Sequence, residues 1–167
     1  MSRGKGPARH MAREAAFQVL YGLTFAPAAN IAELETAFRN RPAPELPRAC
    51  QAQEAAGADG AAAGDPAAEP TGFDWELVKG VWKNLDAIDR VIDATSRHWR
   101  VERMGRIELT ILRIGVFELT LSDDPVPPRV AMDEAIELTR TFAGEKAIAF
   151  VNGVLDAVAR QGQQDPE

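Results

Sequence analysis

The stretch IELTILRIGVFEL, residues 107–119, sets large apolar side chains at intervals of three and four residues. This spacing is typical of a helix with one apolar face. The side chains that we assign to this face are Ile107, Ile111, Leu112, Ile114 and Leu119. The stretch therefore predicts a core-facing helix that ends near Ser122.

The residues after this helix predict two more helices. Residues 123–128 include three prolines, and each proline biases the residue before it away from the α conformation. Pro128 suits the first position of the next helix, which we expect to end at Ala143-Gly144. A last helix follows, with Ile148, Val151, Val154, Leu155 and Val158 on its apolar face.

The residues before it predict three helices. Residues 12–25 keep a helical apolar spacing up to Pro27, and Asn30 with Glu33 resembles a capping box that begins a short second helix. A longer helix of about five turns begins near residue 73, with Asp74 as its N-cap. Because no segment shows the apolar alternation of a β-strand, we predict an all-α fold.

Residues 41–72 differ in composition from the rest of the chain. They include eleven Ala, five Pro and four Gly, and Leu46 is their only large aliphatic residue. Such a segment buries too little apolar surface to offset the entropy lost on ordering. We therefore predict residues 1–40 as an N-terminal helical part with a basic arm, 41–72 as a flexible insertion, 73–161 as the remaining helices and 162–167 as a polar tail.

Charge is distributed unevenly along the chain. The first thirteen residues carry four positive charges and no acid, whereas the whole chain has a formal net charge of −6. A basic end on an acidic body suggests contact with nucleic acid. The alternative is a solvated terminus with no ligand.

Several function classes lack the residues that they need. There is one cysteine, Cys50, and there are two histidines and three serines, so a multi-cysteine zinc site or a Ser-His-acid triad has almost no candidates. No apolar run approaches the roughly 20 residues that span a bilayer. We expect a cytoplasmic protein that is not an enzyme and that has no cofactor, no metal and no membrane segment.

Four segments together resemble the NusB family. They are AREAAFQVLY at 12–21, ILRIGVFEL at 111–119, a Val-Pro pair followed by VAMDEAIEL within 126–138, and FVNGVLD at 150–156. They occur in the family's order and cover the chain except for residues 41–72. The resemblance implies a compact bundle of about seven helices in two helical subdomains.

The resemblance also implies a function. Family members act in transcription antitermination: they bind the boxA element of ribosomal transcripts together with NusE, a small-subunit ribosomal protein, and support the elongating RNA polymerase. The acidic body leaves a second hypothesis open, in which the chain is a helical protein–protein module or a homodimer whose RNA role is minor.

Site residues follow from the resemblance position by position. Arg9, His10 and Arg13 match the arginine-rich start of the first helix, which contacts RNA in the family, and Lys146 and Phe150 match RNA-facing positions in the last helix. For Arg13 the alternative is a salt bridge inside the bundle. For Phe150 it is ordinary core packing. RNA specificity requires that these two groups share one surface.

The family's partner surface maps to the second subdomain. Glu102 and Glu108 match positions where carboxylates pair with the basic NusE, and the alternative is plain solvated surface. Four arginines, at 97, 100, 103 and 106, form an extra basic cluster. This cluster either extends the RNA-binding track or balances acidic neighbours.

Overall fold

The computed structural model describes residues 7–41, 68–96 and 99–164, and this part of the chain contains helices and no strand. The α-helices are α1 (Pro7–Leu23), α2 (Ile31–Arg39), α4 (Phe73–Lys83), α5 (Leu85–Thr95), α6 (Arg106–Thr120), α7 (Pro128–Phe142) and α8 (Ile148–Gln164). Two short 3-10 helices, η1 (Val101–Arg103) and η2 (Glu145–Ala147), precede α6 and α8. The all-α prediction is confirmed.

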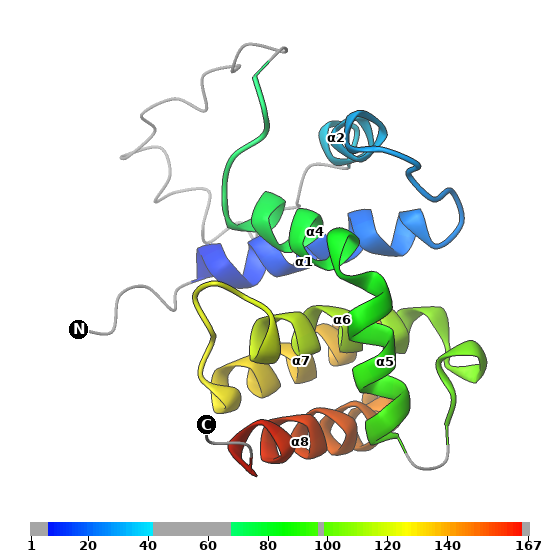
Figure 1. Ribbon diagram of the computed structural model, residues 1–167, viewed down its shortest axis with the longest axis vertical. Helices are drawn as coiled ribbons and strands as arrows, with labels where there is room; N and C mark the ends of the chain where they lie inside the picture. Colours follow the sequence, from blue (N-terminus) through cyan, green and yellow to red (C-terminus); the bar gives the residue numbers. More distant parts are fainter. Residues whose placement is uncertain (1–6, 42–67, 97–98, 165–167) are drawn as a thin grey trace.

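Helix α6 forms the centre of the bundle. It packs against α1, α4, α5, α7 and α8, and residues 109–112 and 114–118 are all buried. Figure 1 shows α1 on one side of α6 and α7, and α8 on the other. At Gly115 a Cβ atom would lie 2.9 Å from the side chain of Leu155, so the missing side chain allows α8 to approach closely. Residues 107–119 thus lie at the centre of the core.

Helices α1, α2 and α4 pack together at one end of the molecule (Figure 1). Phe38 of α2 meets Trp75 of α4 edge to face, with 5.0 Å between ring centroids. The indole N–H of Trp82 donates to the carbonyl oxygen of Ala28 at 3.2 Å, which ties the loop after α1 to α4. These contacts hold the α1–α2 loop in place.

Most predicted helix boundaries agree with the structure. The Asn30 side chain accepts from the Glu33 N–H at 3.0 Å, and the Glu33 carboxylate accepts from the N–H of Ala29. Pro128 is the first residue of α7. After α7, Gly144 has φ of +87°, a conformation that favours glycine, and the chain turns there into η2.

Three boundaries differ from the predictions. The helix expected to run without interruption from residue 73 is broken at Asn84, whose side-chain amide and backbone N–H both donate to the Gly80 carbonyl oxygen, at 2.8 and 3.2 Å. The N-cap of α4 is Gly72, because Asp74 lies in the first turn and binds Arg41 at 2.6 Å. Helix α1 begins at Pro7, five residues before the apolar spacing at 12–25, and Arg9 and His10 lie in its first turn, at the helix start where the resemblance had placed them.

The predicted insertion at 41–72 and the predicted polar tail at 162–167 are only partly described by the structure. Most of the predicted insertion, residues 42–67, lies outside the described residues. Helix α8 continues to Gln164, past the start of the predicted polar tail at residue 162. None of the described helices is both long and apolar enough to cross a membrane.

Candidate nucleic-acid interface

Arg13 is a buried ion-pair residue. Its side chain is 2% exposed, and its guanidinium binds both oxygens of Glu118 on α6, with N–O distances of 2.6, 3.0 and 3.1 Å. A second carboxylate, Glu134 on α7, lies 3.7 Å away. Of the two readings of Arg13, the structure shows the salt bridge inside the bundle, and in this conformation the guanidinium is closed to a ligand.

The carboxylate partner of Arg13 is itself in an apolar environment. Burial raises the pKa of the Glu118 carboxyl above its ordinary value of 4.5, while the bonds from Arg13 act in the opposite direction. Since the Glu118 side chain is also 2% exposed, the pair depends on its own hydrogen bonds for compensation. This pair joins α1 to α6.

His10 lies one turn before Arg13, on the same side of α1. Its Nδ1 is 2.9 Å from Glu134 Oε2, and its Nε2 is 3.3 Å from Glu14 Oε1. The contact of His10 with Glu14 lies within α1, between residues one turn apart. The contact with Glu134 joins α1 to α7 and could not be read from the spacing.

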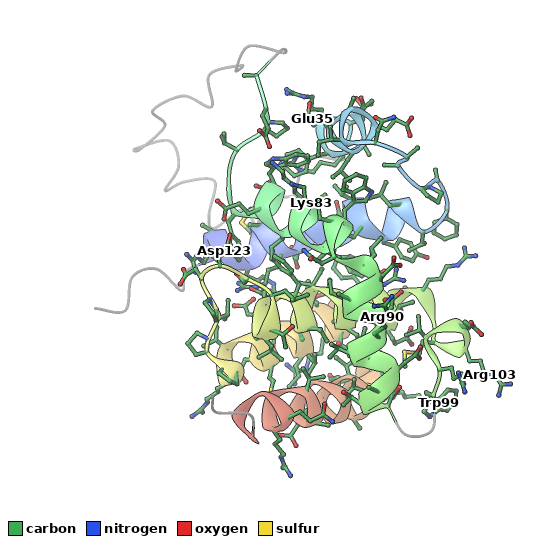
Figure 2. The ribbon with its side chains drawn as sticks, viewed as in Figure 1. Glu35, Lys83, Arg90, Trp99, Arg103 and Asp123 are labelled. Atoms are coloured by element: carbon green, nitrogen blue, oxygen red, sulfur yellow. The ribbon has the colours of Figure 1, made fainter. Side chains whose placement is uncertain are left out.

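Arg9 is the most available of the three α1 residues. It is partly exposed, and its guanidinium stands 4.9 Å from the centroid of the Phe73 ring. Within the described part of the chain, no carboxylate oxygen lies within 4.0 Å of it. Arg9 also lines a groove of about 680 Å³ whose lining includes Lys83 and Asp123, both labelled in Figure 2.

A second site lies where η1, α6, η2 and α8 meet. It is a groove of about 380 Å³, and its lining includes Trp99, Arg103, Met104, Gly105, Glu108, Lys146 and Phe150. Trp99 is 54% exposed, and its ring meets that of the half-buried Phe150 edge to face, with 6.2 Å between centroids. Phe150 packs against the core, as the alternative reading expected, and it also lines the groove.

Cations flank this aromatic pair. Lys146 in η2 and Arg103 in η1 are exposed, and Figure 2 shows Trp99 and Arg103 projecting from the segment between α5 and α6. Glu108 is half-buried in the same groove, whereas Glu102 is exposed outside its lining. The groove thus combines two aromatic rings, two cations and one carboxylate.

The predicted basic cluster is divided between two surroundings. Arg103 lies in the groove, whereas the guanidinium of Arg106 stacks 4.5 Å from the centroid of the exposed Phe25 ring. Arg100 is exposed, and position 97 lies outside the described residues.

The two predicted RNA-binding groups are not adjacent. Arg9 lines a small pocket with Pro127 and Val130 at the start of α7, whereas Lys146 follows the end of the same helix. A helix of 15 residues is roughly 22 Å long at 1.5 Å per residue, so the groups are separated by about one helix length. The structure instead joins Lys146 and Phe150 to Glu108, which had been assigned to a protein partner.

Sequence reasoning missed two exposed aromatic residues, Trp99 and Phe25. The available signal for Trp99 was an aromatic residue inside a run of arginines, a pattern that suits nucleic-acid stacking. Phe25 continued the apolar pattern of α1 and gave no such signal. As for metals, the described residues contain no cluster of three or more His, Cys, Asp or Glu that would hold an ion.

Comparison with known proteins gives one family. The model of the NusB family matches residues 10–160. The transcription antitermination protein NusB of Desulfovibrio desulfuricans is 47% identical over 160 residues, which cover 96% of this chain and 89% of the relative. That of Myxococcus xanthus is 39% identical over 152 residues, which cover 91% of this chain and 94% of the relative.

Solved structures agree with this result. NusB of T. maritima superposes with a TM-score of 0.67 over 95% of this chain and 94% of its own, and its 24% sequence identity shows the shared fold alone. A crystal structure of the antitermination factors NusB and NusE in complex with double-stranded RNA superposes with a TM-score of 0.60. It shows 27% identity and covers 92% of this chain and 96% of its own.

Proposed function

The chain belongs to the NusB family of transcription antitermination proteins, and on this premise we propose that it binds boxA RNA of ribosomal transcripts together with NusE. The proposed activity is non-enzymatic and takes place in the cytoplasm, where the complex supports the elongating RNA polymerase. The related complex of NusB and NusE with double-stranded RNA supports the choice of partners. The proposal rests mainly on the groove that is lined by Trp99 and Phe150.

The chemistry of this groove suits an unpaired nucleotide. Trp99 offers an exposed ring face, and Phe150 supports it from the side. Proteins that bind single-stranded RNA stack bases on aromatic rings, with about 1–3 kcal/mol per base. Lys146 and Arg103 lie where they can reach the phosphates beside a stacked base.

Arg9 supplies a second contact in this proposal. Because it is about one helix length away from the groove, it contacts the RNA backbone at a different nucleotide. Arg13 acts indirectly, by anchoring α1 through Glu118. The RNA therefore runs from the start of α1 past α7 to the groove.

The carboxylates are assigned to NusE. Glu102 is exposed and Glu108 borders the groove, so a basic partner bound there would also contact the RNA-binding residues. This arrangement predicts that NusE and RNA bind cooperatively, since each would neutralise charges that the other meets.

The proposal is tested by titrating boxA RNA and a scrambled RNA of equal length, with and without NusE, at several salt concentrations. We expect boxA to bind more tightly and NusE to increase the difference. Lys146→Ala is expected to weaken binding and to lower the salt slope by about 0.7–0.9 for one lost phosphate contact. Equal affinity for both RNAs would rule out sequence-specific recognition.

Arg160→Ala is the matched control for Lys146→Ala. Arg160 is an exposed cation of α8 that pairs with Asp156, near the opposite end of the helix from the groove. It carries the same charge as Lys146, so removing it changes the net charge equally. If Arg160→Ala weakens RNA binding as much as Lys146→Ala does, the groove has no special role.

The alternative function is a protein–protein module or homodimer. Two exposed aromatic residues, Phe25 and Trp99, favour it, since exposed rings are common in interfaces. Sedimentation across the working concentration range tests it: association of the free chain that is lost in Trp99→Ala or Phe25→Ala would support it, whereas a monomer throughout would count against it.

A further inference from the structure

The carboxylate of Glu108 forms part of the wall of the groove around Trp99. Glu108 lies in the first turn of α6, and its half-buried side chain lines the groove of about 380 Å³ together with Trp99 and Phe150. At Gly105 a Cβ atom would lie 2.2 Å from Glu108 Oε2, so the carboxylate rests against a backbone that has no side chain. Glu108 is thus placed at the site where the proposed function stacks a base.

The oxygens of this carboxylate are unused within the described structure. Within residues 7–41, 68–96 and 99–164, no group donates a hydrogen bond to the Glu108 side chain, and no cation lies within 4.0 Å of it. Glu118, at the other end of α6, differs because its oxygens accept three hydrogen bonds from Arg13. An ionised carboxylate accepts hydrogen bonds and does not donate them. A ligand that meets Glu108 in the groove must therefore offer donors.

The four RNA bases differ in the donors that their Watson–Crick edges present. Guanine has two adjacent donors, N1–H and the N2 amino group, and these match the two oxygens of a carboxylate. Adenine and cytosine have one amino group beside an acceptor nitrogen, and uracil has one N–H between two carbonyl oxygens. Unpaired RNA bases are read on this edge while they stack on aromatic rings. A carboxylate beside an exposed aromatic ring therefore favours guanine.

We propose that Glu108 determines the base specificity of the groove and reads a guanine that stacks on Trp99. This inference rests on the proposed RNA binding. It changes one assignment: the resemblance gives Glu108 to NusE, whereas its place in the groove gives it to RNA, and the exposed Glu102 remains for NusE. Lys146 and Arg103 line the same groove and offset the repulsion between this carboxylate and the RNA phosphates.

The first experiment compares short uridine RNAs that carry guanosine, inosine or adenosine at one central position. Affinity is measured by fluorescence anisotropy of labelled RNA at low salt, where phosphate contacts are strongest. We expect guanosine to bind roughly 5- to 150-fold more tightly than adenosine, the range for one bidentate base contact. Inosine keeps N1–H but lacks the amino group, so its affinity is expected to lie between the two. Equal affinity for the three RNAs would overturn the inference.

Two variants test whether the preference comes from the carboxylate. Glu108→Gln places an amide donor against the donors of guanine, so the preference for guanosine is expected to fall to within about twofold. Gly105→Ala keeps the charge but puts a Cβ atom where the carboxylate lies, so it is expected to reduce the preference as well. An acid in the first turn also stabilises a helix through its dipole, but this role would change the affinity of the three RNAs equally. A preference that persists in both variants would overturn the inference.

Glu145→Gln is the matched control for Glu108→Gln. Glu145 is exposed in η2 next to Lys146, pairs with Arg140 at 3.2 Å and does not line the groove. Its replacement removes the same charge close to the groove, so any general gain in attraction for RNA is shared by the two variants. We expect the control to keep the preference for guanosine. Loss of the preference in the control as well would show that Glu108 does not read the base.

NusE binding in the absence of RNA separates the two assignments of Glu108. If Glu108→Gln weakens NusE binding and leaves the guanosine preference intact, the carboxylate belongs to the protein partner and the inference is wrong. A chain that binds boxA RNA but shows no preference among the three bases would contradict the inference alone. A chain that binds none of these RNAs would contradict the proposed function as well.

Discussion

The start of α1 and the groove around Trp99 contain the same kinds of side chain in opposite settings. At α1, Arg13 is closed off by Glu118 and stacks on the Phe73 ring, and a histidine is shared by two acids. In the groove, Arg103 and Lys146 are exposed, and the aromatic rings face solvent or each other. Arg13 at the start of α1 therefore holds the fold together, whereas the two cations of the groove are exposed.

The largest expected effect comes from the buried Arg13–Glu118 pair at the start of α1. Arg13→Met leaves the Glu118 carboxylate buried without its cation, which we expect to lower the free energy of unfolding by about 3–5 kcal/mol at pH 7. Arg113→Met is the control, since the bidentate pair of Arg113 with Asp89 is partly exposed and is worth about 1 kcal/mol or less. Equal losses in urea unfolding would contradict the distinction.

The same variant has a defined pH dependence. Arg13 opposes the burial that raises the pKa of Glu118, so its removal raises that pKa further. The folded variant then binds a proton more tightly than the unfolded chain does, and the stability lost at neutral pH returns as the pH falls toward 4.5, the ordinary glutamate value. The double variant Arg13→Met, Glu118→Met is expected to be more stable than Arg13→Met at pH 7, because no buried charge remains unpaired.

A smaller effect is expected from the exposed Trp99 in the groove. Trp99→Ala removes an exposed ring, so we expect a change in unfolding free energy within about 0.5 kcal/mol and a loss of RNA binding of about 1–3 kcal/mol. Phe25→Ala removes another exposed ring, outside the groove. An RNA titration in which both variants bind equally well would remove Trp99 from the proposed interface.

The smallest effects are expected from two arginines of the basic cluster, Arg103 and Arg106. Arg103→Ala is expected to lower the salt slope of RNA binding by about 0.7–0.9, the change for one lost phosphate contact, because Arg103 lies in the groove. Arg106→Ala is expected to leave that slope unchanged and to cost about 0.5–1 kcal/mol of stability, from its contact with Phe25. Equal salt slopes for the two variants would show that Arg103 and Arg106 both contact the RNA or that neither does.

Local patterns predicted the helices well where a single physical signal was sufficient. Apolar spacing identified α6, Asn30 with Glu33 identified the start of α2, and Pro128 identified the start of α7. Asn84 shows where this reasoning failed. The apolar spacing continues across it, yet α4 ends there, and the Asn84 side chain donates to the Gly80 carbonyl oxygen, a side-chain contact that apolar periodicity does not register.

The candidate site was less predictable because the relevant neighbours are far apart in the chain. Glu118, which neutralises Arg13, is 105 residues away, and Glu134, which binds His10, is 124 residues away. Sequence could rank a salt bridge against an RNA contact for Arg13, but it could not identify the acid. It also paired Lys146 and Phe150 with the α1 residues, whereas the folded chain sets them about one helix length from Arg9.

Sequence patterns alone predict the helical fold, the places where most helices begin and end, and the family of the chain, because these depend on apolar spacing, capping residues and short motifs. Which charges are available to a ligand depends instead on how the helices pack. Electrostatic interactions act across a few ångströms of space and depend strongly on burial, so the same arginine is an internal anchor beside Glu118 and an open cation beside Trp99.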